Sequence, residues 1–114
     1  MKEKRPDDEA YIRSILAAID NIALHRSRGS TDDDMLRKAV VYELLTIGEG
    51  CNKVSNALQQ KYPEVEWPLV IAARNKMIHE YIAIDFDIAW DIVDNYLPGL
   101  RERLVIILRN EWNG

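Results

Sequence analysis

The sequence predicts an all-α protein: one domain, residues 1–114, folded as an up-and-down bundle of four long helices with the last helix kinked at Pro98-Gly99. Two observations predict this fold class. Apolar residues recur at steps of three and four along four separate stretches, which places them on one face of a helix. No stretch alternates apolar and polar residues as a half-buried strand does. With 47% apolar and 30% charged residues, a chain of this length can bury one core.

The first two helices are predicted on either side of a turn at Gly29 and Ser30. The first follows RPDDEA, because acidic residues suit a helix N-terminus. The second is capped by Thr31 or Asp32 and extends to about residue 60. Its predicted buried stripe consists of Leu36, Val40, Leu44, Ile47, Cys51, Val54 and Leu58.

Two glycines, Gly48 and Gly50, interrupt the second helix. Each costs about 1 kcal/mol relative to alanine, and the close approach of another helix or of a ligand offsets that cost. A Gly-x-Gly without a following Gly-Lys-Ser/Thr does not form a phosphate loop. We therefore favour tight helix packing over a ligand role at these positions.

The third and fourth helices are separated by the short link IAID. The third begins at Trp67-Pro68, since proline is tolerated in a first turn, and it frays near Tyr81. The fourth is capped by Asp85 and disturbed at Pro98-Gly99, where proline clashes with the carbonyl four residues earlier. Alternating steps of four and three predict its seam: Phe86, Trp90, Val93, Leu97, Leu100, Leu104 and Ile107.

Charge and composition exclude several classes of protein. The net charge of −4 and pI near 5.1 argue against a protein that coats nucleic acid, although a local site for one RNA remains compatible. No apolar run approaches the roughly 18–20 residues of a membrane span, and MKEKRPDDEA has no apolar signal region. The single Cys51 excludes an internal disulfide and a CxxC cluster. We expect a cytoplasmic protein with no membrane part.

The stretch ARNKMIHEY brings together four residues suited to phosphate chemistry: Arg74, Asn75, His79 and Tyr81. An Arg five residues before a His arises by chance with a probability of about 0.16, but the full pattern has a probability of about 0.0004. In a helix Asn75 and His79 share a face, whereas Arg74 and His79 diverge by about 140°. A shared site then needs a swing of the Arg74 side chain, a loosened helix end at His79, or a second subunit.

The chemistry of these residues points to RNA cleavage. His79 can act as base or acid near neutral pH, and Arg74 offers a fork that matches phosphate oxygens. Asn75 can orient the imidazole or the substrate, and Tyr81 can contact a phosphate or stack on a base. The attacking 2′-hydroxyl belongs to the RNA, so no metal or cofactor is expected.

Each of these residues also has an ordinary structural interpretation. A lone His at a helix end often interacts only with the helix dipole, and a lone Arg is usually solvated or ion-paired. A di-iron centre is excluded, because no Glu stands three residues before His25 or His79. Two functional alternatives stay open beside the nuclease: a non-catalytic helical dimer that binds a nucleotide or a protein, and a purely structural adaptor.

RNKMIHEY resembles the Arg-x4-His-x-Tyr motif of HepT-like toxins in the HEPN superfamily. TIGEGCNKVS, WPLVIAARN and IDFDIAWDIVDNYLPGLRERL resemble other segments of that family, so the resemblance runs from about residue 7 to 108. Two positions depart from it: Ala72 replaces a common Gly and Gly50 replaces a common Ala. Neither belongs to the motif.

The resemblance implies a HEPN-like bundle that forms a homodimer, in which two motifs line one cleft. It implies a metal-independent endoribonuclease, the toxin of a type VII-like toxin–antitoxin pair, that cuts RNA such as tRNA or mRNA. Arg74 and His79 would be catalytic, with Asn75 and Tyr81 in support. The implied partner is a minimal nucleotidyltransferase antitoxin, which also forms a larger complex with the toxin. Its transfer of AMP to Tyr81 would add bulk and negative charge beside the site.

Overall fold

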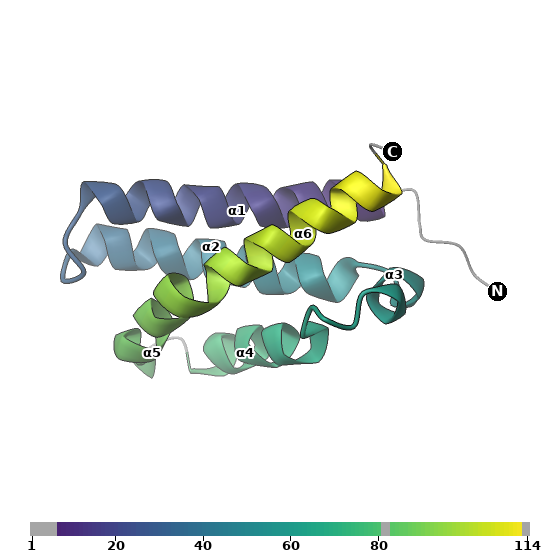
Figure 1. Ribbon diagram of the computed structural model, residues 1–114. Helices are drawn as coiled ribbons and strands as arrows, with labels where there is room; N and C mark the ends of the chain where they lie inside the picture. Colours follow the sequence, from purple (N-terminus) through teal and green to yellow (C-terminus); the bar gives the residue numbers. More distant parts are fainter. Residues whose placement is uncertain (1–6, 81–82, 113–114) are drawn as a thin grey trace.

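The computed structural model describes residues 7–80 and 83–112, and these residues form helices and turns without any strand (Figure 1). This confirms the predicted all-α fold class. The elements in chain order are α1 (Asp8–Arg28), α2 (Asp34–Lys53), α3 (Asn56–Lys61), α4 (Trp67–His79), α5 (Phe86–Asp91), the π-helical segment η2 (Ile92–Tyr96) and α6 (Leu97–Glu111).

Helix α2 lies at the centre of the arrangement. It packs along α1 on one side and along α4 on the other, and α6 crosses α1 diagonally (Figure 1). Because α5, η2 and α6 run on from one another, the four long rods of the predicted bundle are α1, α2, α4 and the α5–η2–α6 segment. None of the described helices combines the length and apolar character that crossing a membrane requires.

The predicted stripes form the core. Every residue of the stripe predicted for the second helix is buried, and so is the seam of the last rod apart from Phe86, which is partly buried. The α1 contribution to the same core consists of Ile12, Ile15, Ala18, Ile19 and Ile22.

The second helix ends earlier than predicted. It stops at Lys53, because Val54 turns to an extended conformation and the hydroxyl of Ser55 accepts the Leu58 N–H to begin α3. The buried carboxylate of Asp8 accepts the Ser55 N–H at 2.9 Å and its hydroxyl at 2.6 Å. Since Val54 and Leu58 are buried on both sides of the break, the apolar pattern continues across it.

The helix caps agree in part with the prediction. Asp85 caps α5, as expected, by accepting the N–H groups of Asp87 and Ile88. The prediction of Thr31 or Asp32 as the cap of α2 is wrong, because Asp33 takes that role and accepts the Leu36 N–H at 2.9 Å.

The disturbance in the last rod lies one turn before the proline. In η2 the helix widens, and the N–H of Leu97 donates to the carbonyl of Ile92, five residues back. Pro98 has no N–H, and its ring would clash with the carbonyl of residue 94 in a regular helix. The wider turn of η2 moves this carbonyl away from the ring. The helix therefore adapts to Pro98 in the turn before the proline.

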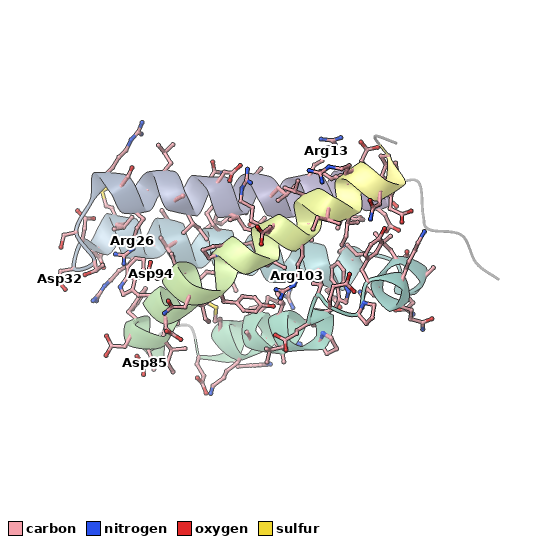
Figure 2. All side chains as sticks on the ribbon, in the orientation of Figure 1. Arg13, Arg26, Asp32, Asp85, Asp94 and Arg103 are labelled. Carbon is pink, nitrogen blue, oxygen red and sulfur yellow. The ribbon has the colours of Figure 1, made fainter. Side chains whose placement is uncertain are left out.

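The C-terminal end of α1 is tied to this segment. Figure 2 shows Arg26 and Asp94 facing one another, and the Arg26 Nη2 donates to the Asp94 carboxylate at 2.7 Å. The same guanidinium lies 4.7 Å from the centroid of the Trp90 ring. The ion pair ties η2 to the end of α1, and the cation–π contact ties the end of α5 to the same residue.

Candidate functional site

Gly48 lets α4, which carries the motif, approach α2 closely. A Cβ added at Gly48 would lie 2.1 Å from the Arg74 Cβ and 2.5 Å from its Cγ, so any side chain there would push the two helices apart. Gly50 has the corresponding role toward α1, where a Cβ would lie 2.6 Å from the Ile15 Cγ1. Both glycines therefore serve tight helix packing, as predicted.

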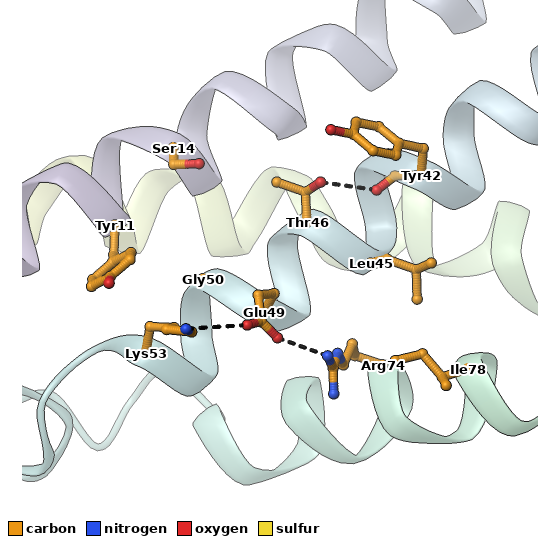
Figure 3. Close-up of a pocket in the computed structure, with 10 residues that line it drawn as sticks. All are labelled: Tyr11, Ser14, Tyr42, Leu45, Thr46, Glu49, Gly50, Lys53, Arg74 and Ile78. Atoms are coloured by element: carbon orange, nitrogen blue, oxygen red, sulfur yellow. Dashed lines mark hydrogen bonds and ion pairs between the residues drawn. The ribbon is translucent and has the colours of Figure 1, made fainter.

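The guanidinium of Arg74 is held at two of its nitrogens, and Figure 3 shows the contact with Glu49. Nη2 donates to the Glu49 Oε1 of α2 at 2.7 Å, and Nη1 donates to the Asn75 side-chain oxygen at 2.8 Å. The other Glu49 oxygen lies 3.6 Å from the Lys53 ammonium. The sequence predicts that Asn75 orients the imidazole or the substrate, whereas in this structure its side-chain oxygen accepts from Arg74.

An open cleft of about 490 Å³ lies over α2 between α1 and α4 (Figure 3). Tyr11 lines it from α1, Tyr42 and Lys53 from α2, and Arg74 and Ile78 from α4. Tyr42 is 69% exposed and Ile78 44% exposed, so aromatic and apolar surface borders the ion pair. The cleft thus offers two cations, Arg74 and Lys53, both paired with Glu49, together with ring surface to a ligand.

His79 is the last residue of α4, and its side chain is exposed. Within the described residues, no hydrogen bond or ion pair joins it to Arg74, which turns toward α2 instead. Of the three arrangements for a shared site, the swing of Arg74 is not the one seen. The helix end and the second subunit remain. Tyr81 lies outside the described residues.

Glu49 is the site residue that sequence reasoning missed. Its spacing of four from Lys53 is typical of an ordinary surface ion pair on one helix, and that pair does form. Nothing local links Glu49 to Arg74, which lies 25 residues further along the chain. The neighbouring Gly48 could have indicated Glu49, because a glycine within a helix marks the turn at which another helix approaches closely.

Potential metal ligands are scattered over the molecule. Within residues 7–80 and 83–112, no three His, Cys, Asp or Glu side chains gather into a cluster that could hold a metal ion. The carboxylate bonded to Arg74 is that of Glu49.

Comparison with known proteins gives relatives from archaea and bacteria. A "Putative RNase" of Methanocaldococcus jannaschii is 33% identical over 100 residues, which cover 83% of this chain and 82% of the relative. A "Putative RNase" of Caldanaerobacter subterraneus subsp. tengcongensis is 27% identical over 111 residues, or 97% and 99% of the two chains. The "Probable ribonuclease HepT" of Thermococcus cleftensis is 29% identical over 105 residues, or 89% and 93%.

No solved structure gives a significant match to this chain. The family model described as HepT-like, Ribonuclease HepT-like, matches residues 12–107. This range includes the cleft residues Glu49 and Arg74 and the helix end at His79. The chain therefore belongs to the ribonuclease HepT-like family of the HEPN superfamily.

Proposed function

We propose that this protein is a metal-independent endoribonuclease and acts in the cytoplasm as the toxin of a type VII-like toxin–antitoxin pair. One observation carries the proposal. The Arg74 guanidinium is fixed at the edge of an open cleft, and an exposed histidine ends the same helix in a chain of the ribonuclease HepT-like family. The names of the relatives support RNA as the substrate.

In the proposed reaction the RNA supplies its own nucleophile. The 2′-oxygen attacks the adjacent phosphorus and loses its proton to a base, and the bond from phosphorus to the 5′-oxygen breaks. An acid gives a proton to that leaving oxygen, so the products are a 2′,3′-cyclic phosphate and a 5′-hydroxyl. His79 exchanges the protons, and Arg74 stabilises the negative charge that builds on the phosphate oxygens.

A homodimer fits this chemistry better than a single chain. The reaction needs a base and an acid, and each chain supplies one motif histidine. Arg74 is held toward α2 while His79 lies exposed at the end of α4. A two-fold axis near this helix end would bring two copies of the motif to one cleft.

The antitoxin part of the proposal concerns Tyr81. A minimal nucleotidyltransferase partner would transfer AMP to its hydroxyl, two residues after His79. The added phosphate is bulky and negative, so it would occupy the site and repel the RNA backbone. Before modification, Tyr81 would contact a phosphate or a base of the substrate.

Replacement of His79 tests the proposal. We expect His79→Ala to abolish growth arrest in a host that lacks the partner, and to lower cleavage of tRNA and mRNA by the purified protein at least 100-fold. Wild-type cleavage should persist in EDTA. His25→Ala is the matched control, because His25 lies on α1, is not among the residues that line the cleft, and should leave both activities unchanged when it is replaced.

Two results would contradict the proposal. Equal growth arrest by wild type and His79→Ala would exclude His79 as the catalyst. Wild-type protein that leaves RNA intact but binds a nucleotide stoichiometrically would instead support the non-catalytic binding module.

A further inference from the structure

We infer that Glu49 is a positioning residue for Arg74, holding the guanidinium in the orientation in which it receives the RNA phosphate. This inference rests on the proposed function. It extends the site from α4 to α2, and so makes the contact between these two helices part of the machinery for cleavage.

The position of Arg74 is fixed at its stem and at its end. At the stem, the missing side chain of Gly48 lets the Cβ and Cγ of Arg74 lie against the α2 backbone. At the end, Glu49 binds Nη2 and Asn75 binds Nη1. Two bonds to different nitrogens of a planar group fix its plane, and acceptors on two helices also fix its distance from α2.

This ion pair is not explained by stability. The side chain of Arg74 is 26% exposed and that of Glu49 is 43% exposed. Partly exposed pairs contribute little to folding, because water screens the charges and two long side chains lose freedom. A pair of this kind matters more where the position of the charge affects a rate.

The negative charge of Glu49 also acts on the RNA itself, and this effect opposes binding. Its carboxylate lies between the Arg74 guanidinium and the Lys53 ammonium, at the edge of the same cleft. A bound RNA phosphate there meets this negative charge and is repelled. Glu49 should therefore raise the rate of the chemical step while weakening the binding of RNA.

These opposed effects give a test that a merely structural residue would not pass. In Glu49→Ala we expect kcat to fall about 10–30-fold, because Arg74 loses its fixed plane. Binding of a 2′-O-methylated RNA, which cannot be cleaved, should tighten about 2–5-fold. Glu49→Gln loses the charge but keeps an acceptor for Arg74. It should therefore bind the RNA as tightly as Glu49→Ala does and recover most of the kcat that Glu49→Ala loses.

Glu43→Gln is the matched control on the same helix. Glu43 is buried and accepts the Asn21 Nδ2 of α1 at 3.2 Å, away from Arg74. Its replacement should change neither kcat nor RNA binding. In an Arg74→Lys background, Glu49→Ala should cause no further loss of kcat, because the planar group on which it acts is gone.

A readout independent of cleavage separates this inference from the proposed function. Side-chain ¹⁵N NMR should show a more restrained Arg74 guanidinium in wild type than in Glu49→Ala, where only the Asn75 bond remains. An unchanged spectrum, or a kcat within about twofold of wild type for Glu49→Ala, would overturn the role of Glu49. A wild-type protein that cuts no RNA while the NMR difference persists would overturn the nuclease proposal alone.

Discussion

The two faces of α2 that meet α1 and α4 differ in what a glycine brings close. On the α1 face Gly50 admits Ile15, whose side chain is fully buried. On the α4 face Gly48 admits Arg74, whose side chain is 26% exposed and ends in an open cleft. The same local feature thus serves a closed apolar contact on one side and a charged, open contact on the other.

The energetics of the two contacts explain the difference. A helical glycine costs about 1 kcal/mol relative to alanine, and burying a side chain such as Ile15 returns about 1.5–3 kcal/mol. The α1 contact is therefore favourable on packing grounds alone. Arg74 brings much less apolar burial to Gly48, so the value of that contact lies in where it places the guanidinium.

The largest effects should come from truncating the two side chains. We expect Ile15→Ala to lower the free energy of unfolding by about 2–5 kcal/mol, since it leaves a cavity in the core, while the folded fraction stays active. Arg74→Ala should lower RNA cleavage about 10²–10³-fold with less than about 1 kcal/mol lost in stability. Urea unfolding and initial cleavage rates measure both quantities. A large stability loss in Arg74→Ala would remove the contrast between the two faces.

Adding one methyl group to each glycine should separate the faces in the same way. In Gly48→Ala the new Cβ displaces α4 and its guanidinium, so cleavage should fall about 100-fold. In Gly50→Ala the overlap with Ile15 should cost about 1–2 kcal/mol of stability after the gain in helix propensity. Activity per folded molecule should survive in Gly50→Ala. If Gly50→Ala lost cleavage and Gly48→Ala lost only stability, the roles given to the two glycines would be wrong.

The last effect appears only at alkaline pH and concerns Cys51, which is fully buried on the core side of α2. Burial raises the pKa of its thiol from 9.0 to about 12. Between these pH values the unfolded chain has released the proton that the folded chain retains. The free energy of unfolding should therefore fall by up to about 1.4 kcal/mol per pH unit above pH 9, and the full stability is present below it.

Cys51→Ala supplies the reference for this measurement, because lysines and tyrosines also titrate in the alkaline range and are common to both proteins. Urea unfolding at several pH values from 8 to 11 should give a steeper decline for wild type than for the variant. Parallel declines would mean that the thiol contributes nothing to the pH dependence.

Much of the fold could be predicted from the sequence, because the apolar residues that form the core follow helical spacing. The pattern failed at Val54 and Ser55, where burial continues although the helix stops. The break depends on Ser55 bonding to Asp8, which lies 47 residues earlier in the chain. A local pattern does not report such a partner.

In the site, too, local spacing predicted some features, whereas contacts between distant segments decided others. Arg74 and His79 were selected by residue type and spacing, and helical geometry predicted that they would diverge. The bond from Glu49 to Arg74 joins two helices, and its geometry depends on how closely Gly48 lets them approach. That distance is a property of the packed molecule. The catalytic roles of Arg74, Asn75, His79 and Tyr81 stay predictions.

Helix α4 buries few of its side chains, which affects how easily it unfolds locally. Of its 13 residues only Trp67 is fully buried, and α2 is its principal neighbour. A helix with so little buried surface opens by local unfolding at a low free energy, well below that of the whole domain. Any molecule that binds over α4 is then thermodynamically linked to its folding and shifts the opening equilibrium. A second copy, an RNA or an inhibitory partner would each change the fraction of time for which the helix is formed, and with it the lifetime of the protein in the presence of proteases.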